Sequence, residues 1–473
     1  MKQKTQEIVQ YKDPYPQSIF SEFSADLVKG IKKGDKAFSF PAIIQLDMTN
    51  NCNLNCVGCW CHSELMGELK FKGDWKQKHL PKNIVLKLIK QAAENGTREI
   101  QLSGSGDPMM YPYFMDAVRA IKENGLILHL ITNFTLVSKD ILKKFVELGV
   151  DRITLSLWAG SAETYAKTHP NQTGKTFEKI KENLLYLASL KNNNKLPRIK
   201  IYNVISNKNY DNIKDMIDFA FETDVEFIEF QIIDTIEGKS DSLALTEKQK
   251  KVILNQFEKI RKRNNHFTLG DDNELEFADF GRLYKEKTLP DGFSIEENGK
   301  KLKCPKGFIS FTGRTYLDSP TSLKFHFSQG ICITCKNNSI CYSNEYPFKL
   351  EFLRVLGIGS FLRRIKNIKD NKEQQHDINI VDKLPCYIGW TFTRILPNGD
   401  VLPCCKAHKK PLGNLHEKSF KDIWYSNNYN EFRLLAKTQK KSHPYFNINS
   451  PGFSISFFPI FLIAISNIIK SSA

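Results

Sequence analysis

Between residues 42 and 233 the chain alternates short apolar runs with amphipathic stretches, and this alternation constrains the fold most. The apolar runs are near-continuous and predict six buried strands: Ala42–Met48, Glu99–Ser103, Leu126–Thr132, Arg152–Leu157, Arg198–Ile205 and Glu226–Ile233. Segments with helical periodicity and helix start or stop signals lie between them: Pro81–Asn95, Phe114–Asn124, Ser138–Leu148, Lys175–Leu190 and Asn212–Thr223. Such repeats predict a parallel sheet covered by helices. Six units are too few for a closed eight-stranded barrel, so we predict an α/β fold, an open (β/α)6 partial barrel.

Three cysteines follow the first predicted strand directly. Cys52, Cys56 and Cys59 have the spacing C-x3-C-x2-C. Three thiolates on one short loop can ligate three irons of a [4Fe–4S] cluster and leave the fourth iron open. A structural zinc site normally uses a second cysteine or histidine pair, which the loop lacks, and a disulfide needs an oxidising compartment. We therefore expect an iron–sulfur cluster, with a structural metal site and free thiols as the alternatives.

This cysteine spacing resembles the signature of the radical S-adenosylmethionine (radical SAM) superfamily, and the resemblance covers about residues 40–240. It implies a partial barrel, a [4Fe–4S] cluster on the three cysteines, and SAM chelating the open iron through its amine and carboxylate. Two positions depart from the family pattern. Gly58 stands where the family commonly has an aromatic residue against the adenine, and Trp60, just beyond it, is our candidate for cofactor binding. Cys61 is an extra thiol, which would exclude SAM if it ligated the fourth iron.

Ligands of parallel α/β sheets bind at the carboxyl ends of the strands, so the loops after the later strands should contact SAM. The Ser-Gly-Asp-Pro segment at 105–108 resembles the Gly-Gly-Glu-Pro segment of the family. Glycine there lets the backbone approach the ligand, and a carboxylate can accept from the SAM ammonium. Thr132-Asn133 resembles the family's Thr-Asn-Gly, with Phe134 in place of the glycine. The resemblance implies cofactor contacts at Ser105, Gly106, Asp107 and Asn133, and ordinary strand-end hydrogen bonding is the alternative for Asn133.

The end of the fourth strand, residues 154–158, resembles the Ser-(Leu/Ile)-Asp segment of the family, with Trp158 where Asp is usual. Ser156 is a candidate for the SAM carboxylate or ribose, with strand-end hydrogen bonding as its alternative. The loop beyond could face the substrate with Trp158, Tyr165, His169 and Asn171, although for His169 alone a surface-loop position is favoured. The ends of the fifth and sixth strands, Ile205–Asn207 and Gln231, are secondary candidates for adenine and substrate.

Seven further cysteines follow in two groups. Asn398-Gly399 is a strong turn signal and predicts a hairpin over Thr393–Leu402 within the second group. Both groups resemble the SPASM extension, which carries auxiliary iron–sulfur clusters in many radical SAM enzymes. We expect one four-thiolate site, for which iron–sulfur is favoured over zinc, and a second set that lacks a full complement of local ligands. The predicted metal ligands are Cys304, Cys332, Cys335 and Cys341 in the first group, and Cys386 and Cys404, next to Cys405, in the second.

Shifts in composition predict the division of the chain. From the N-terminus we expect an extension (1–39), the partial barrel (40–240), a helical linker (241–303), a cysteine-rich auxiliary-cluster segment (304–345), a basic linker (346–380), an incomplete SPASM-like α+β domain (381–445) and an apolar tail (446–473). For the tail we favour a foreign segment from a frameshift or truncation over a packed helix or a membrane anchor.

The net charge of +16 comes from 68 Lys and Arg against 52 Asp and Glu. Because the basic residues are dispersed, we favour a solvated lysine-rich surface over nucleic-acid binding. The N-terminus has no apolar segment of a secretory leader, and eleven cysteines then indicate metal binding in a reducing cytoplasm. Membrane contact through the tail is not favoured.

These observations favour a radical SAM enzyme supplied with electrons by a flavodoxin- or ferredoxin-type reductant. The resemblance implies reductive cleavage of SAM and abstraction of hydrogen from a substrate. We lean to a peptide or protein side chain because of the SPASM-like region. The alternatives are modification of a sugar or small metabolite, or a non-enzymatic cysteine-rich protein that binds zinc and nucleic acid.

Overall fold

The computed structural model describes residues 25–191, 196–225, 227–263, 281–284, 294–297, 300–303, 308–311, 388–404 and 410–438. The predicted ligands Cys304, Cys332, Cys335, Cys341 and Cys386 lie outside the described residues, as do Cys405 and the apolar tail. In the part of the chain that is described, no helix is both long and apolar enough to cross a membrane.

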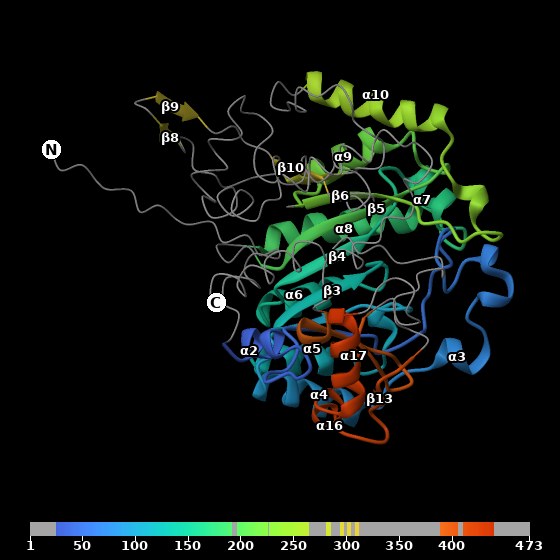
Figure 1. Ribbon diagram of the computed structural model, residues 1–473. Helices are drawn as coiled ribbons and strands as arrows, with labels where there is room; N and C mark the ends of the chain where they lie inside the picture. Colours follow the sequence, from blue (N-terminus) through green and yellow to red (C-terminus); the bar gives the residue numbers. More distant parts are fainter. Residues whose placement is uncertain are drawn as a thin grey trace.

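One open sheet organises the molecule (Figure 1), in the order β10-β7-β6-β5-β4-β3-β2-β1-β11-β12-β13. Its central strands lie within two residues of the predicted ones: β1 (Ile43–Leu46), β2 (Glu99–Leu102), β3 (Ile127–Thr132), β4 (Arg152–Ser156), β5 (Arg198–Ile205) and β6 (Phe227–Ile232). These strands pair in parallel, which confirms the open partial barrel. The flanking strands are β7 (Gly281–Tyr284), β10 (Phe308–Phe311), β11 (Phe392–Ile395), β12 (Asp400–Leu402) and β13 (Gly413–Asn414). A separate hairpin pairs β8 (Ser294–Glu297) with β9 (Lys300–Lys303).

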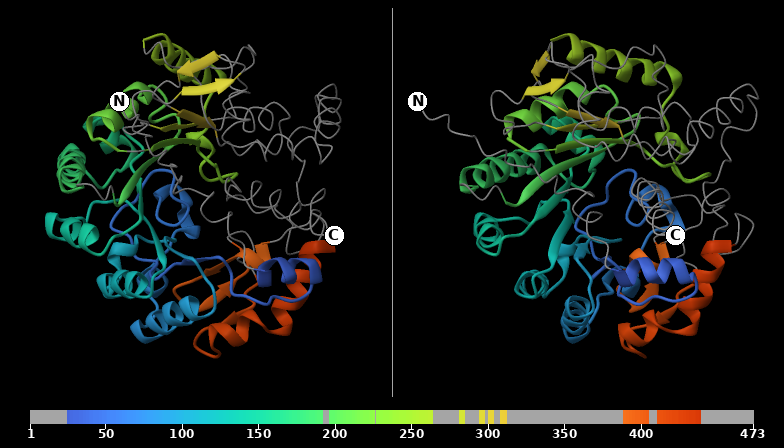
Figure 2. Two further views of the ribbon diagram at one scale, coloured as in Figure 1. Left: turned by 90° about the vertical axis from the view of Figure 1, so that its left-hand side faces the viewer. Right: turned by 60° about the vertical axis from the view of Figure 1, so that its left-hand side comes forward.

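The predicted helices are also confirmed, and Figure 2 shows them along the convex side of the curved sheet. They are α4 (Lys82–Glu94), α5 (Phe114–Glu123), α6 (Lys139–Glu147), α8 (Gly174–Leu190), α9 (Ile213–Glu222) and α10 (Glu247–Arg263). Helix α7 (Ala162–Thr168), a short helix after β4, was not predicted; its N-cap is Ser161, whose side chain accepts from the Thr164 amide. Short elements complete the described chain: α2 (Ala25–Lys33), η1 (Glu64–Leu69), α3 (Gly73–Gln77), η2 (Pro108–Met110), η3 (Asp241–Leu243), α15 (Ile388–Thr391), α16 (Phe420–Trp424) and α17 (Asn427–Thr438).

The face of the sheet that packs against the helices is apolar. Alternate residues of each strand point to this face and are almost fully buried, for example Ile44, Leu102, Leu130, Leu155 and Ile201, each 0% exposed. Side chains from α4, α5, α6, α8 and α9 join them in one continuous core. Burying a leucine or isoleucine in this way contributes about 1.5–3 kcal/mol relative to leaving it exposed.

The opposite, inner face of the sheet is polar, which corrects the interpretation of the strands as near-continuously apolar. The register places Gln101 opposite His129, His129 opposite Arg152, and Thr154 opposite Lys200. Glu99, His129, Arg152, Thr154 and Lys200 are all at most 3% exposed. Glu99 forms an ion pair with Arg152, and His129 Nε2 lies 2.9 Å from Thr154 Oγ1. Because side chains of a strand alternate between its faces, the polar residues collect inside the curve.

The C-terminal hairpin extends this same sheet. β11 pairs in parallel with β1, with Ile43 opposite Phe392 and Leu46 opposite Ile395, and β11 and β12 form the predicted hairpin around Gly399, which has a φ of 88°. Arg394 crosses to β1, where its Nε donates to Asp47 Oδ2 at 3.0 Å. The residues predicted as a separate C-terminal domain therefore share a hydrogen-bonded sheet with the barrel.

Two tryptophans hold the rest of the C-terminal region against the N-terminal residues. Trp390 Nε1 donates to Lys36 O at 2.9 Å, and Trp424 Nε1 donates to Ser39 O at 2.8 Å. Arg433 of α17 is 0% exposed and donates to Trp424 O at 2.9 Å. These contacts fix α15, α16 and α17 beside the start of β1.

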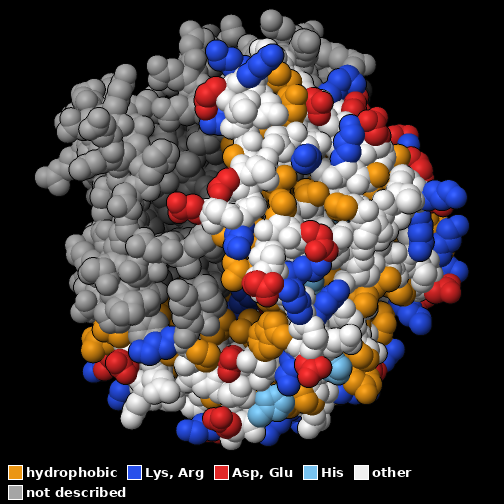
Figure 3. Space-filling view, turned by 90° about the vertical axis from the view of Figure 1, so that its right-hand side faces the viewer, with side chains coloured by type: hydrophobic (Ala, Val, Ile, Leu, Met, Phe, Trp, Pro, Cys, Tyr) orange, Lys and Arg blue, Asp and Glu red, His pale blue; other side chains and the backbone are white. Residues whose placement is uncertain are grey.

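Charged side chains of both signs are interspersed over the face of the molecule shown in Figure 3. Exposed charged side chains also pair within one helix, as in Lys167–Glu163 at 2.6 Å and Lys250–Glu247 at 2.5 Å. Such exposed pairs contribute little to stability. On the face shown, the charges fit the predicted solvated surface, and the absence of nucleic-acid binding stays a prediction.

Candidate functional site

The three-cysteine loop begins where β1 ends, at the carboxyl edge of the sheet. A turn closes it, since Cys59 N donates to Cys56 O at 3.0 Å and Ser63 Oγ donates to Val57 O at 2.6 Å. Cys52, Cys56 and Cys59 are free thiols and are half-buried. The loop therefore has the fixed backbone that the predicted cluster requires.

The end of β3 supports the loop from one side. Asn133 Nδ2 donates to Asn53 Oδ1 at 2.9 Å and lies 3.9 Å from Cys52 Sγ. Asn53 Nδ2 in turn donates to Thr135 Oγ1 at 2.8 Å. Asn133, predicted to bind the cofactor, thus contacts Cys52, a predicted cluster ligand, whereas Asn53 and Thr135 were not singled out from the sequence.

The loop after β4 supports the cysteines from the other side. Val57 N donates to Thr168 O at 3.0 Å, at the end of α7. Asn171 Nδ2 donates to Asn53 O at 2.7 Å, and Asn171 Oδ1 accepts from Asn55 N at 3.2 Å. In the structure, Asn171 therefore fixes the backbone of the cysteine loop, a role that differs from the predicted contact with substrate.

The two glycines after β2 allow the strand ends to pack closely. A Cβ on Gly106 would lie 2.3 Å from Asn51 O, and one on Gly104, whose φ is +139°, would lie 2.5 Å from Asp47 Cγ. Asp107 N donates to Asn51 O at 2.9 Å. Glycine is therefore required here for contact with the segment before Cys52, in addition to any approach to a ligand.

The Asp107 carboxylate joins the ends of β2 and β3. Its oxygens accept from Asn133 N at 2.7 Å, Thr132 Oγ1 at 2.8 Å and Met109 N at 2.9 Å. The residue is 4% exposed, and burial raises the pKa of this carboxyl above its ordinary value. Three protein donors already bind the carboxylate, so its contact with the SAM ammonium stays a prediction, and its evident role is to position Asn133.

The missing aromatic residue at position 58 has a packing explanation. A Cβ on Gly58 would lie 2.5 Å from Ile233 Cδ1 and 3.5 Å from Trp158 Cζ3, so the space is already occupied. Trp158 adopts the left-handed conformation with a φ of 59°, which is uncommon for a bulky residue. Trp60 points to the end of β6, where its Nε1 donates to Asp234 O at 3.1 Å.

The predicted surface position of His169 is wrong. His169 is 1% exposed and stacks on Tyr165, with ring centroids 4.2 Å apart and an interplanar angle of 21°. Burial lowers the pKa of His169 to about 4, so the imidazole is neutral at neutral pH. The sequence pattern did not reveal this because α7, which buries the ring, was not recognised.

The remaining predicted residues lie around the same edge. Ser156 is the last residue of β4 and is half-buried on the inner face, opposite Tyr202. Ser105 O lies 2.8 Å from His62 Nε2, and its Oγ accepts from Arg394 at 3.4 Å. Gln231 of β6 is 8% exposed. Cys404, the auxiliary cysteine within the described residues, is half-buried just beyond β12.

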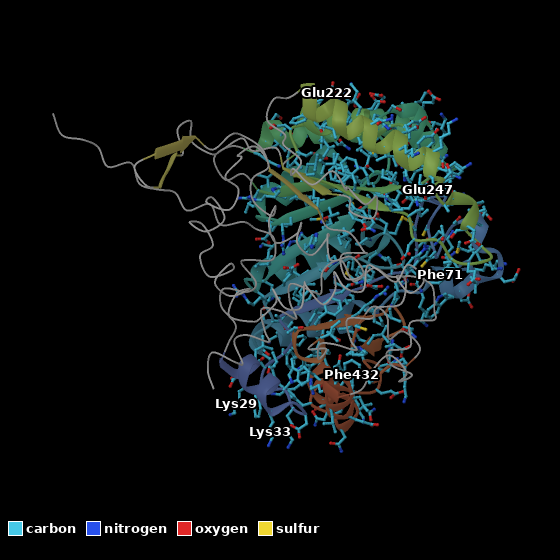
Figure 4. The ribbon with its side chains drawn as sticks, turned by 45° about the horizontal axis from the view of Figure 1, so that its top comes forward. Lys29, Lys33, Phe71, Glu222, Glu247 and Phe432 are labelled. Atoms are coloured by element: carbon cyan, nitrogen blue, oxygen red, sulfur yellow. The ribbon has the colours of Figure 1, made fainter. Side chains whose placement is uncertain are left out.

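Cys61 lies beside the three predicted ligands. Its backbone oxygen accepts from the amide of Phe71, labelled in Figure 4, at 2.8 Å. A hydrogen bond from the Cys61 thiol lowers the pKa of Cys59 to about 7. The hydrogen bond to Cys59 and burial together hold the pKa of Cys61 well above its ordinary value. In this arrangement Cys61 is a neutral thiol that donates to Cys59.

The pKa values of the cysteine thiols in the loop indicate that thiolates would form there when a positively charged metal group is bound. Burial raises the pKa of Cys52 to about 12 and that of Cys56 well above its ordinary value. Thiols in this state are protonated at neutral pH, so they become thiolate ligands only when a metal supplies positive charge. Among the described residues no three His, Cys, Asp or Glu side chains converge on a single ion. The ligands of a four-iron cluster are spread more widely than those of one ion.

Two family matches agree with this geometry. Residues 46–220 match the radical SAM superfamily, and residues 386–447 match SPASM, an iron–sulfur cluster-binding domain. The radical SAM domain implies a [4Fe–4S] cluster and SAM, and the SPASM domain implies auxiliary iron–sulfur clusters. The first match runs from the last residue of β1 into α9 and includes the cysteine loop, and the second contains β11 to α17.

The individual relatives share less than a third of their aligned residues with this chain. A tungsten-containing aldehyde ferredoxin oxidoreductase cofactor-modifying protein of Pyrococcus furiosus is 28% identical over 187 residues, which are 39% of this chain and 49% of that protein. A probable GTP 3',8-cyclase of Sulfurisphaera tokodaii is 26% identical over 229 residues, 47% of this chain and 67% of that protein. The chain thus spans about half the length of the first and two thirds of the second.

Among solved structures, Streptococcus suis SuiB bound to S-adenosylmethionine is 15% identical, with a TM-score of 0.49 over 88% of this chain and 74% of SuiB. The chain belongs to the radical SAM superfamily and carries a SPASM iron–sulfur cluster-binding domain.

Proposed function

We propose that this protein is a radical SAM enzyme that abstracts hydrogen from a peptide or protein side chain. The observation that carries the proposal is the three-cysteine loop at the carboxyl end of β1, held by Asn133 after β3 and by Thr168 and Asn171 after β4. Catalytic loops positioned by a rigid sheet are typical of this edge in parallel α/β folds.

The chain contributes ligands, orientation and a polar interior. Cys52, Cys56 and Cys59 would hold a [4Fe–4S] cluster, and the cluster with SAM supplies the 5′-deoxyadenosyl radical when both are bound. Asp107 and Asn133 fix the neighbouring strand ends, and Ser105, Gly106, Ser156 and Trp60 stay our predicted cofactor contacts. The hydrogen bonds of Asn133, Thr168 and Asn171 keep the cysteine loop in one conformation. In our proposal the substrate binds against the inner face of the sheet.

Two features support a peptide or protein substrate. The SPASM domain follows the radical SAM domain, and its strand β11 lies directly beside β1 in the sheet. The inner face near the carboxyl edge carries Ser156, Tyr202 and Gln231, side chains that can exchange hydrogen bonds with peptide groups. A flavodoxin- or ferredoxin-type reductant is the electron donor we propose.

For the SPASM region we propose an auxiliary iron–sulfur cluster on Cys304, Cys332, Cys335 and Cys341, with Cys386 and Cys404 in a second set. Its role would be to bind substrate or to accept an electron after hydrogen abstraction. Replacing Cys335 should therefore impair turnover of substrate and leave SAM cleavage intact.

Anaerobic reconstitution tests the proposal. The wild-type protein should bind iron and sulfide, and should form 5′-deoxyadenosine from SAM under dithionite. Cys59→Ala should abolish this product, while Cys335→Ala should retain it. A wild-type protein that binds iron and sulfide but forms no 5′-deoxyadenosine would contradict the enzymatic proposal.

A second candidate is modification of a nucleotide or other small metabolite. It is favoured by the probable GTP 3',8-cyclase among the relatives. Incubating the reconstituted protein with SAM and either GTP or the peptides of a tryptic digest separates the two candidates. Uptake of deuterium into 5′-deoxyadenosine from one deuterated substrate class, and not from the other, decides between them.

A further inference from the structure

Tyr165 of α7 has a buried hydroxyl group without a partner. The side chain is 0% exposed, and within the described residues its hydroxyl makes no hydrogen bond. Leaving such a group unpaired in the interior costs about 1–3 kcal/mol. By contrast Tyr111, which is 2% exposed, donates its hydroxyl to Leu80 O at 2.9 Å. The unpaired group at Tyr165 therefore needs an explanation, and a bound acceptor is one.

The position of Tyr165 points to the cysteine loop. One turn after it, at the end of α7, Thr168 O accepts from Val57 N at 3.0 Å, so the helix end lies directly against the loop. The ring is held in place by His169 stacked on it, with centroids 4.2 Å apart, and by Phe177 at 5.9 Å. Burial raises the pKa of Tyr165, and the negative charges that Cys56 and Cys52 carry when ionised raise this pKa further, which places the two cysteines in the neighbourhood of Tyr165. A ring fixed in this way thus carries an unpaired donor in the neighbourhood of the predicted cluster ligands.

We propose that the Tyr165 hydroxyl donates a hydrogen bond to a sulfur atom of the iron–sulfur cluster held by Cys52, Cys56 and Cys59, and thereby raises the reduction potential of that cluster. The inference deepens the proposed function and rests on it. Reduction adds negative charge to the cluster, so a donor at sulfur stabilises the reduced form more than the oxidised form. Asn133 Nδ2, 3.9 Å from Cys52 Sγ, is a second donor on the opposite side of the loop.

The test compares Tyr165→Phe with the matched control Tyr111→Phe, both in the full chain after anaerobic reconstitution without SAM. We expect the midpoint potential of the Tyr165→Phe cluster to fall, so that the ratio of reduced to oxidised cluster at a fixed potential drops about tenfold, which for one electron is about 59 mV. Pulsed EPR of the reduced protein in water and in deuterium oxide should show an exchangeable proton coupled to the wild-type cluster. That signal should be missing in Tyr165→Phe and present in Tyr111→Phe.

Thermal unfolding of the apoprotein is the second readout. Because the Tyr165 hydroxyl is unpaired without the cluster, Tyr165→Phe should melt at or above the wild-type temperature, whereas Tyr111→Phe should melt below it. A folded Tyr165→Phe protein that no longer assembles the cluster also supports the proposal.

The proposal is overturned if Tyr165→Phe assembles a cluster with the wild-type potential and proton coupling. It is overturned equally if the apo form of Tyr165→Phe is destabilised, since the hydroxyl would then have a structural partner. Failure of the wild-type protein to assemble any cluster would instead defeat the proposed function itself.

Discussion

The two faces of the central sheet differ in both chemistry and burial: the outer face is apolar and fully buried, whereas the inner face combines buried polar side chains with half-buried ones. Leu130 of β3 points to the helices and is 0% exposed, while its neighbour His129 points to the inner face and is 3% exposed. Apolar packing stabilises the outer face without directional requirements. The inner face depends on an ion pair, Glu99 with Arg152, and on hydrogen bonds such as that between His129 and Thr154. Burial alone therefore does not predict the type of residue in a partial barrel.

The largest expected effect tests whether the inner face depends on charge pairing. Although burial opposes ionisation, Arg152 and His129 hold the pKa of Glu99 below its ordinary value, so the carboxylate is charged. Glu99→Leu removes this carboxylate from the buried Arg152 guanidinium. The substitution should lower the free energy of unfolding by about 3–5 kcal/mol, measured by urea titration.

Combining Glu99→Leu with Arg152→Leu should recover most of that loss, because both charges are then removed. Glu163→Gln, at an exposed carboxylate of α7, should leave the unfolding midpoint unchanged. If Glu99→Leu alone unfolds like the wild-type protein, the inner face does not depend on pairing.

An intermediate effect is expected on the outer face. Leu130→Ala removes a fully buried side chain from the contiguous core and should cost about 3 kcal/mol, measured by the same titration. Leu130→Met keeps most of the volume and should cost less than about 1.5 kcal/mol. Equal losses for both variants would contradict close packing between the strands and helices.

The smallest expected effect is a dependence of stability on pH that distinguishes the two faces, since among the strand side chains that the structure describes, the titrating ones lie on the inner face. Burial lowers the pKa of His129, which faces Glu99 of β2, Arg152 of β4 and Lys200 of β5, from 6.5 to about 4. Between pH 6.5 and about 4, His129 is protonated in the unfolded chain but not in the folded chain. The free energy of unfolding therefore falls as the pH falls through this range. At pH 5.5 the loss should be about 1.4 kcal/mol.

His169 adds to the same window, because burial lowers its pKa to about 4 as well. His129→Asn and His169→Phe should therefore each remove part of the slope of unfolding free energy against pH, and the double variant most of it. A slope that survives both substitutions would assign the pH dependence to other groups.

Much of the fold could be predicted because strands and helices depend on patterns of residues that are close together in the sequence. Strand lengths followed from apolar runs, and helix ends from signals such as Ser138, whose side chain accepts from Ile141 N, and Gly149, which has a φ of 65°. The polar alternation of Glu99-Ile-Gln-Leu102 is also present in the sequence, but the prediction of buried parallel strands depended on the apolar residues. Helix α7 was missed because it is only seven residues long.

The candidate site also has features that could be predicted from the sequence and features that could not. The cysteine spacing, and the place of the loop at the end of β1, could be predicted from residues close together in the chain. The supports could not, because Asn171 lies 116 residues from Asn55, and Arg394 lies 347 residues from Asp47. Nothing in the local sequence around those residues indicates a partner.

The sequence by itself determined the order of strands and helices, the three-cysteine loop and the turn at Asn398-Gly399, because each depends on neighbouring residues. The tertiary structure decided that β11 pairs with β1, that Asp107 binds the end of β3, and that Tyr165 lies unpaired against the loop. These outcomes depend on sheet register and curvature, which bring distant segments into contact at ångström distances that no local pattern encodes.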